Sequence, residues 1–234
     1  ISSVDGSITI TANNHTGASR GLYFATANAS IQTTGTGSIS LSANSSTNGD
    51  TFGNLATLSA GGALSITTVK DLTIPNALST VGSATFASTG GSLTLNANQT
   101  ISGSGNAFTG KAATDIFANN NITTTGGAVT LWSDTDAAST RGGGISVAAA
   151  ATISTSGGAV SLSGGTDNTT SWAKGTAATN DTGVQLFGAI TAGAGAVTLR
   201  GEEGANPSTT RQGIQLLQSS SITTTSGVVT LNGK

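Results

Sequence analysis

The chain contains no cysteine and no methionine, and only two of its 234 residues are proline. Without cysteine, the fold cannot depend on disulfides or on thiolate-bound metal ions. No run of about 18 apolar residues is present, so no transmembrane segment is predicted. The lack of disulfides is compatible with secretion, because a rod of stacked repeats can bury a core without them.

Charged residues are scarce as well, at 8% of the sequence against roughly 25% in ordinary soluble domains. Four Lys and four Arg are scattered along the chain, and the formal net charge is −2. There is no basic stripe and no interleaving of basic and aromatic residues, so we expect no nucleic-acid partner. The single histidine, His15, has no candidate partners nearby in the sequence, so no catalytic residue is predicted there.

Small and hydroxyl-bearing residues dominate instead, with 73 Ser and Thr and 34 Gly. Such a composition can indicate disorder, but here the apolar residues recur in register. One phrase, Gly–small residue–apolar–Ser/Thr–apolar, occurs eight times, at residues 6–10, 37–41, 62–66, 91–95, 127–131, 158–162, 195–199 and 227–231. Random low complexity does not produce this regularity, so we interpret the chain as folded.

The spacing of the phrase predicts the architecture. Successive glycines are 31, 25, 29, 36, 31, 37 and 32 residues apart, and a period of about thirty with β-type content is typical of a solenoid. Alternate side chains of a strand face opposite sides, so Val129 and Leu131 should point inward and Thr130 outward. The leading glycine suits a corner with positive φ, or one that passes close to its neighbour.

Each repeat contains two further predicted strands. The second begins at an isoleucine five or six residues before the phrase, at Ile31, Ile122, Ile153, Ile190 and Ile222. The third follows a glycine further upstream, at residues 21–24, 144–147, 183–186 and 213–216. Loops of variable length separate the phrase from this third strand, at 11–20, 132–143, 163–182 and 200–212, and the short steps between Gly37 and Gly91 leave little room for them.

These elements predict one all-β domain over residues 1–234, a parallel β-helix of about eight coils. Each coil has roughly 31 residues and three strands, and the variable loops lie on one edge. Residues 1–10 carry the pattern in the same phase as residues 222–231. We therefore expect the chain to be a segment of a longer fibre, or a subunit within one.

Two phrases, at Ile122–Leu131 and Ile153–Leu162, look like the repeats of filamentous-haemagglutinin-like large exoproteins. The resemblance covers nearly the whole chain and is weakest between Gly49 and Ala87. It implies a right-handed helix, in line with the handedness rule for parallel crossovers. It also implies export by a Gram-negative bacterium and a role in adhesion, aggregation or biofilm. The shared motif is structural and carries no binding residues.

Rare aromatic and acidic residues in the loops are the candidates for contact with a ligand or partner. An exposed tryptophan can stack on a sugar ring or anchor a partner, although each could instead cover the apolar corner beneath its loop. The carboxylates could gather on one edge, but no calcium-binding phrase is present, so no metal or cofactor is expected. The candidate contact residues are Trp132, Asp134, Asp136, Trp172 and Asp181.

The outward position of the phrase bears a hydroxyl in all eight copies: Thr9, Ser40, Ser65, Thr94, Thr130, Ser161, Thr198 and Thr230. This column could form an ice- or sugar-binding face, or it could simply reflect the preference of hydroxyl residues for the outer face of a β-coil. A flat ice-binding face requires two adjacent columns of this kind, and the preceding outward column mixes Ser, Ala and Val.

The sequence thus predicts a non-enzymatic structural or adhesive rod, extracellular or at the cell surface. Its expected partner is a glycan, a protein or a second copy of itself. Three alternatives stay open. They are a filament subunit that stacks end to end, a polysaccharide-acting β-helix enzyme that uses loop carboxylates, and an ice-binding solenoid.

Overall fold

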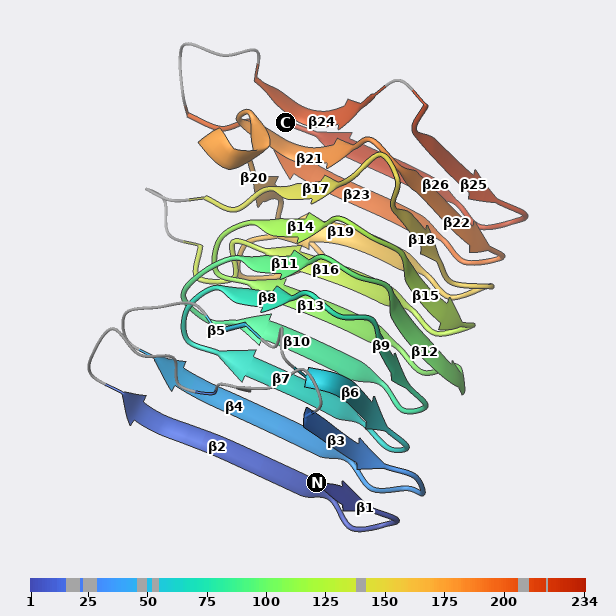
Figure 1. Cartoon of the computed structure of the whole chain (residues 1–234). Coiled ribbons are helices and arrows are strands. Elements are labelled where there is room, and N and C mark those ends of the chain that lie inside the picture. Colours follow the sequence, from blue (N-terminus) through green and yellow to red (C-terminus); the bar gives the residue numbers. More distant parts are fainter. Residues whose placement is uncertain are drawn as a thin grey trace.

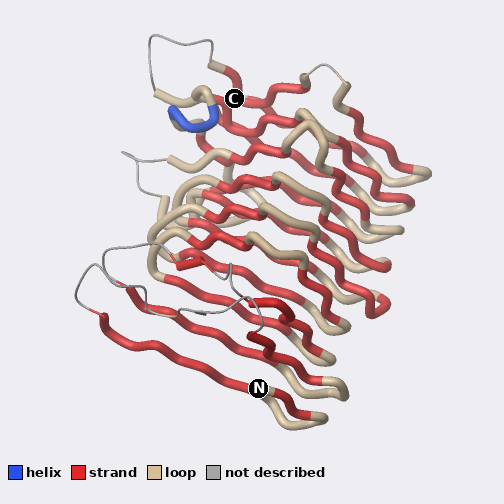
Figure 2. The backbone as a smooth tube through the Cα atoms, viewed as in Figure 1, coloured by secondary structure: helices blue, strands red, loops and turns tan. Residues whose placement is uncertain are grey.

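A computed structural model describes residues 1–15, 22, 29–45, 50–51, 55–137, 142–205, 211–217 and 219–234. The described strands form three long parallel sheets, which is consistent with a parallel β-helix (Figure 1). A single turn of 3₁₀ helix, Ala177–Thr179, is the one short helix drawn in Figure 2. Within the described residues, no helix has the length and apolar character needed to cross a membrane.

The three sheets are here called A, B and C. Sheet A has the order β1 (Ser2–Ser3), β3 (Ala29–Thr33), β6 (Leu55–Ala60), β9 (Leu78–Thr80), β12 (Gln99–Ser104), β15 (Ile122–Thr125), β18 (Thr152–Ser154), β22 (Ala189–Gly193) and β25 (Ser221–Thr224). Sheet B has the order β2 (Ile8–His15), β4 (Ile39–Ser45), β7 (Leu64–Thr68), β10 (Ala84–Ser88), β13 (Phe108–Ala112), β16 (Val129–Ser133), β19 (Val160–Gly164) and β23 (Val197–Glu202), after which both β20 (Ala173–Lys174) and β26 (Val229–Gly233) pair with β23. Sheet C has the order β5 (Asp50–Thr51), β8 (Leu72–Ile74), β11 (Leu93–Leu95), β14 (Ile116–Ala118), β17 (Ile145–Val147), β21 (Thr182–Leu186) and β24 (Gln212–Leu216).

The chain visits the sheets in the fixed order A, B, C and then returns to A one strand further along. Strands β12, β13 and β14 make one such pass, here called a coil, and β15, β16 and β17 make the next. The two termini consequently lie at opposite ends of the stack (Figure 1). The predicted second strands all fall in sheet A. Of the predicted third strands, those at 144–147, 183–186 and 213–216 fall in sheet C, whereas the one at 21–24 lies outside the described residues, apart from Leu22.

The predicted register is wrong in the middle of the chain. The phrase at Gly91 forms β11, which belongs to sheet C and not to sheet B with the other seven copies. Between Leu64 and Val129 the chain makes three compact coils of 20, 24 and 21 residues, as the pairings Leu64–Ala84, Ala84–Phe108 and Phe108–Val129 show. Sheet A therefore has nine strands, so the chain makes nine passes where eight were predicted.

Core packing explains why two strands of sheet B, β10 and β13, lack the repeated phrase. In β10 a small Ala84 precedes the inward Phe86, and in β13 the inward Phe108 precedes Gly110. The two rings pack edge to face with centroids 5.3 Å apart. A Cβ on Gly110 would meet Leu93 and Leu131 side chains at 3.0 and 3.1 Å. The large phenylalanines are thus matched by small residues on neighbouring strands, which keeps the core densely packed. As a result, β10 and β13 do not carry the repeated phrase.

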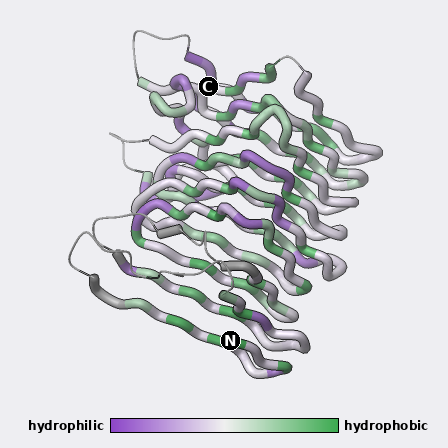
Figure 3. The backbone as a smooth tube through the Cα atoms, viewed as in Figure 1, coloured by the Kyte–Doolittle hydropathy of each residue, from purple (hydrophilic) through white to green (hydrophobic). Residues whose placement is uncertain are grey.

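The predicted inward residues of the inner coils form one continuous core. Val129 and Leu131 are fully buried, while Thr130 between them is partly exposed. The same alternation of buried and partly exposed positions holds in β7 and β10, and Figure 3 shows apolar positions recurring along the strands. The prediction of inward-facing aliphatic pairs is confirmed for these strands.

Close approach between coils accounts for the leading glycines. A Cβ on Gly158 would lie 2.1 Å from the carbonyl oxygen of Gly127, and one on Gly195 would lie 2.0 Å from that of Gly158. Positive φ belongs to the residue before, as at Gly126 (84°) and Gly157 (120°). Of the two reasons predicted for the glycine, steric contact with the neighbouring coil is the one that applies.

Variable loops do occur at one corner, between sheets B and C. Three residues suffice at 69–71 and at 113–115, whereas residues 134–144, 165–181 and 203–211 form long connections. The run of compact coils lies further along the chain than predicted, from Leu64 to Val129, because of the register error above. The long connection after β16 supplies two residues of the candidate site, Thr135 and Asp136.

A matched pair of substitutions tests whether burial comes from stacking. Leu131 and Leu231 occupy the same inward position of sheet B, but Leu131 is fully buried and Leu231 is 43% exposed. Leu131→Ala should cost about 2–5 kcal/mol of unfolding free energy, because it leaves a cavity. Leu231→Ala should cost clearly less. Denaturant unfolding of both variants measures this, and equal losses would contradict the stacking account.

Candidate functional site

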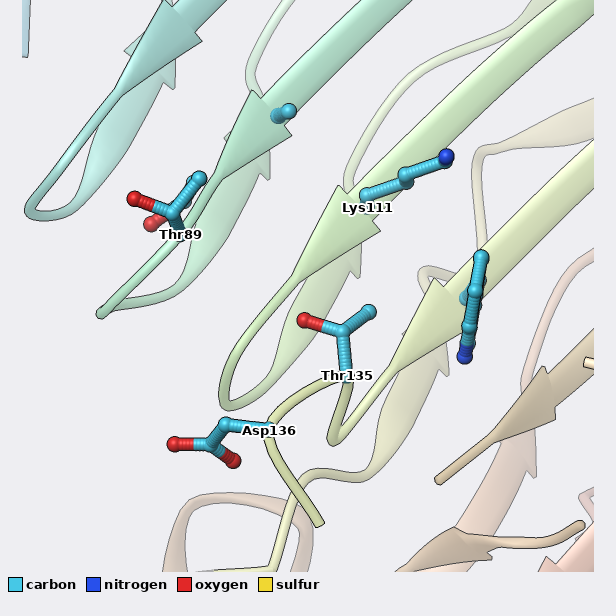
Figure 4. A pocket seen from close by; sticks show the side chains of 7 residues that line it. Thr89, Lys111, Thr135 and Asp136 are labelled. Atoms are coloured by element: carbon cyan, nitrogen blue, oxygen red, sulfur yellow. The ribbon is translucent and has the colours of Figure 1, made fainter. Parts of the chain in front are cut away.

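A shallow pocket of about 290 Å³ lies on sheet B, where it meets the B–C corner. It spans the ends of β10, β13 and β16 and the loop that follows β16 (Figure 4). Its lining residues are Ala87, Ser88, Thr89, Lys111, Trp132, Thr135 and Asp136. Of the predicted contact residues, the structure therefore brings Trp132 and Asp136 together.

Strand alternation places Trp132 on the outer face, because Leu131 and Ser133 on either side of it are buried. Its register partner in β13 is Lys111. The Lys111 ammonium lies 4.9 Å from the centroid of the indole ring, within the range of a cation–π contact. The indole Nε1 donates a hydrogen bond of 2.6 Å to the carbonyl of Gly165. The indole ring is thus held by Lys111 at its face and by the Gly165 carbonyl at its nitrogen.

Lys111 was not singled out from the sequence. Nothing near it in the chain indicates chemistry, and only the pairing of β13 with β16 brings it beside Trp132. Within the described residues it forms no ion pair or hydrogen bond, and its one recorded contact is with the indole ring. Its ammonium is therefore available to a ligand.

The remaining polar groups of the pocket differ in how far they are already engaged. The Ser88 hydroxyl donates to the Lys70 carbonyl and accepts from the Gly91 amide, and that of Thr89 donates to the Thr68 carbonyl. The Thr135 hydroxyl makes no hydrogen bond to any described residue. Asp136 is exposed at the far side of the pocket from Lys111 (Figure 4).

Two predicted contact residues turn out to be buried. Asp134 is 6% exposed and Asp181 is 3% exposed. Both adopt positive φ, 51° and 55°. Asp134 begins the loop after β16 but turns beneath it, whereas Asp136 two residues later faces solvent. Asp134 and Asp181 are therefore corrected from surface contacts to interior residues. The sequence could not show this, because burial arises from the packing of the long loops.

Those loops interlock across coils. The Thr176 hydroxyl donates to Asp115 Oδ1 at 2.7 Å, and the Gly144 amide donates to the same oxygen at 2.8 Å. The Gly143 amide donates to the Lys174 carbonyl, and the Gly204 amide to the Asp181 carbonyl. Loop 165–181 thus joins its neighbours on both sides and encloses the acidic residues.

Burial changes the protonation of Asp134. Desolvation, reinforced by the neighbouring Asp136, Glu202 and Asp115 carboxylates and opposed by Lys174, raises the pKa of Asp134 from 3.8 to about 7. Its Oδ1 is buried without a hydrogen-bond partner. Burial also raises the pKa of Asp115, although its two hydrogen bonds act in the opposite direction.

Trp172 lies apart from the pocket, just before β20. The ammonium of Lys234 lies 5.1 Å from the centroid of its ring and 3.1 Å from Glu202 Oε2. Trp172 thus has a lysine over its ring, as Trp132 does, but this lysine is already engaged in an ion pair. The structure does not unite Trp172 with Trp132 in one site.

The outward hydroxyl column also needs correction. Thr94 lies in sheet C, paired with Thr73, and Thr85 and Thr109 fill the gap in sheet B. The corrected column is unbroken over nine strands: Thr9, Ser40, Ser65, Thr85, Thr109, Thr130, Ser161, Thr198 and Thr230.

A second hydroxyl column lies beside the first only over β2, β4 and β7, at Thr11, Ser42 and Thr67. Further along the stack the same positions are Ala87, Lys111 and Trp132. An ice-binding face built on two columns would therefore be confined to the N-terminal end of sheet B.

The search for metal-binding groups and the comparison with known proteins identify no further feature of the site. Among the residues that the structure describes, no group of three or more His, Asp or Glu is arranged to hold a metal ion. Comparison of the chain with protein-family models, with curated proteins and with solved structures finds no match. Function must therefore be argued from the geometry.

The buried Asp134 predicts an unusual pH dependence. Because its pKa is raised on folding, the folded state holds a proton that the unfolded state releases, so stability should fall between about pH 4 and pH 7. Asp134→Asn mimics the neutral form and tolerates positive φ. The variant should match the wild type near pH 4 and exceed it increasingly up to pH 7, by at most ~1.4 kcal/mol per pH unit.

Asp167→Asn is the control of opposite sign. Hydrogen bonds from Thr169 and Thr170 lower the pKa of this exposed carboxyl. The wild type should therefore gain stability relative to Asp167→Asn as the pH rises through the carboxyl range. Thermal unfolding from pH 3 to pH 8 compares the variants, and a pH-independent effect of Asp134→Asn would refute the assignment.

Proposed function

We propose that the chain is a non-enzymatic extracellular rod, a right-handed parallel β-helix that mediates attachment at the surface of a Gram-negative bacterium. The continuous apolar core and the A, B, C strand order support the rod. Nine stacked strands spaced about 4.8 Å apart span on the order of 40 Å. The resemblance of the repeats at Ile122–Leu131 and Ile153–Leu162 to those of large exoproteins supports the location and the adhesive role.

The observation that carries the adhesive part of the proposal is the pocket around Trp132. It combines a fixed aromatic face with an ammonium that has no ion pair, a hydroxyl and an exposed carboxylate. Aromatic side chains with a few convergent polar groups are typical of small-ligand sites, and the partly exposed indole suits the apolar face of a sugar. A glycan is therefore the proposed partner.

The same geometry disfavours the enzyme alternative. A carboxyl group that attacks or protonates a polysaccharide must reach the glycosidic bond. Asp134 and Asp181 are buried under interlocked loops, and the lining of the pocket contains a single carboxyl, that of Asp136. Hydrolysis with a paired acid and base would require the loops to open.

Glycan binding is tested with the chain and its two tryptophan variants. Trp132→Ala should reduce affinity for a bound oligosaccharide by at least about tenfold, since the stacking surface is lost. Trp172→Ala is the matched control and should bind as the wild type does. A glycan array followed by calorimetry measures both. Unchanged binding by Trp132→Ala, with an intact thermal transition, would reject the pocket as the contact site.

A second candidate function is self-association of this chain end to end. Val229 and Leu231 occupy inward positions yet are 42% and 43% exposed, and Ile1 is 70% exposed. Ile222 in sheet A and Val229 in sheet B lie seven residues apart. Ile1, which directly precedes β1 of sheet A, and Ile8 in sheet B have the same spacing. A single strand register would therefore let the first coil of a second copy stack on the last coil of this chain in sheet A and in sheet B at once. The unpaired strand edges of the two coils would then pair with each other.

The self-association test uses a charge at the end of the rod. Leu231→Lys should shift a concentration-dependent assembly to monomer, because the charge would be buried at the junction. Val81→Lys is the control, since Val81 is 51% exposed on the side of the rod. Size-exclusion chromatography with electron microscopy gives the readout. A wild type that stays monomeric at high concentration would exclude self-stacking.

A further inference from the structure

We infer that copies of this chain join head to tail into an open-ended filament, in which Gly6 of each copy packs against the Gly227 carbonyl of the copy before it. This inference rests on the self-association proposed above as a second function, and it specifies the junction. It depends on where the exposed apolar side chains lie, on the direction of the peptide groups at the two ends and on the packing around the leading glycines.

The exposed apolar side chains gather at the two ends of the stack. The large apolar residues that the described part of the chain exposes are Ile1, Val4, Val81, Leu216, Val228, Val229 and Leu231. All but Val81 lie in the first coil, in the last strands of sheets B and C or at the corner before β26. Exposed apolar patches mark contact sites. The two ends, which Figure 1 shows far apart, are therefore suited to contact with a second copy.

The strands at these ends lack two features that normally keep sheet edges from pairing. Natural edge strands are often protected by charged residues or by proline. Strands β1 and β2 at one end, and β25 and β26 at the other, contain no Asp, Glu, Lys, Arg or Pro. Within the described residues, each of the four pairs with a single neighbour, which leaves its outer edge open. These edges are therefore competent to pair with another copy.

The peptide groups at the two ends of sheet B point in matching directions. The Ile8 amide donates to a carbonyl of the next coil, so the peptide groups of Thr9 point away from the stack. At the other end, the Val228 carbonyl accepts from an amide of the preceding coil, so the peptide groups of Val229 point away from the stack. When Ile8 of one copy lies beside Val229 of another, the Thr9 amide faces the Val229 carbonyl. A slip by one residue would lose this match and turn the apolar side chains outward.

Gly6 is a glycine that a single copy of the chain does not require. A Cβ on Gly37 would lie 2.5 Å from the Gly6 carbonyl oxygen, and this contact forbids a side chain there. In the same way, a Cβ on Gly227 would lie 1.9 Å from the Gly195 carbonyl oxygen. Among the described residues, a Cβ on Gly6 would meet only the Ser3 side chain, whose hydroxyl lies 2.8 Å away and can rotate. The φ of Gly6 is not positive either.

The inferred junction gives Gly6 the same role as the other leading glycines. With Ile8 beside Val229, Gly6 lies beside Gly227, so the Gly227 carbonyl takes the place that the Gly6 carbonyl has beneath Gly37. The junction thus repeats an internal contact between coils. It joins two different surfaces and continues the stack in one direction, so added copies extend the stack and do not close a ring. The product is an open-ended filament.

Cysteine cross-linking tests the register, because the chain has no cysteine of its own. The double variant Thr9→Cys with Thr230→Cys places the two thiols opposite each other across the junction, with Cα atoms about 4.8 Å apart, which a disulfide can span. Oxidation should convert it into a ladder of covalent oligomers that reduction removes. Within one copy the two positions lie at opposite ends of sheet B, so no intramolecular bond competes.

The matched control for the register is Thr11→Cys with Thr230→Cys. Thr11 lies on the same outer face of β2 as Thr9, two residues further along. In the inferred register the Cα atoms of this pair are about 8 Å apart, beyond the reach of a disulfide. The control should therefore remain uncross-linked under the same oxidation.

Gly6→Ala tests the steric contact. Its Cβ would meet the Gly227 carbonyl of the neighbouring copy, so the concentration at which half of the chain is assembled should rise by at least about tenfold. The dilute monomer should unfold at the wild-type temperature, whereas Gly37→Ala should lower that temperature, because its Cβ meets a carbonyl within the same copy. Sedimentation and thermal unfolding give the two readouts.

The outcomes separate this junction from self-association in general. Equal cross-linking by both cysteine pairs, or unchanged assembly by Gly6→Ala, would overturn the inferred junction while self-association stands. A dilute monomer destabilised by Gly6→Ala would also overturn it, because the glycine would then serve the single chain. A wild type that stays monomeric at high concentration would reject the junction and the proposed self-association together.

Discussion

Every coil of this chain depends on the coil beside it. A single pass through sheets A, B and C has two open faces, and its inward side chains are sealed only when a neighbour lies on each. Leu131 and Leu231 belong to the same local phrase, yet one is fully buried and the other is 43% exposed. Stability in such a stack is therefore a property of interfaces between coils and is only weakly encoded within any one of them.

Stacking constrains the three corners unequally. At the A–B corner, the leading glycines leave no room for a Cβ beside the neighbouring coil, and threonine hydroxyls close the turn. The Thr124 hydroxyl, for example, donates to the Gly127 carbonyl at 2.5 Å, and that of Thr224 donates to the Gly227 carbonyl at 2.7 Å. At the B–C corner, buried hydroxyls also bond to carbonyls, but across loops of different length: Thr68 bonds to Lys70, two residues on, and Ser133 bonds to Gly143, ten residues on. This corner therefore accommodates insertions, and the variation in coil length is concentrated there.

The candidate site lies at the B–C corner, where the variable loops adjoin the strands of sheet B. Sheet B supplies a fixed platform for Lys111 and Trp132, and the loop after β16 supplies Thr135 and Asp136. The same loops bury Asp134, whose carboxyl sits without a partner for Oδ1. The long connections thus have two physical effects: they leave polar groups accessible at the rim of the pocket, and they enclose acidic groups behind it.

The sequence alone determined that the chain is all-β and made of stacked parallel strands, because apolar residues two apart, recurring about every thirty residues, indicate strands with one sealed face. It also placed five of the nine strands of sheet A, namely β3, β15, β18, β22 and β25, and the corner that carries the loops. It failed between Leu64 and Val129, where the packing of Phe86 against Phe108 altered the phrase and an Ala or Gly took an apolar position. Trp132 and Asp136 were identified as candidate contact residues of a loop at 132–143, although Trp132 lies in strand β16. Only the tertiary structure decided that Lys111 joins them, that Trp172 does not, and that Asp134 and Asp181 are interior. Those outcomes depend on strand register and on loop packing between coils, and neither is a local property of the chain.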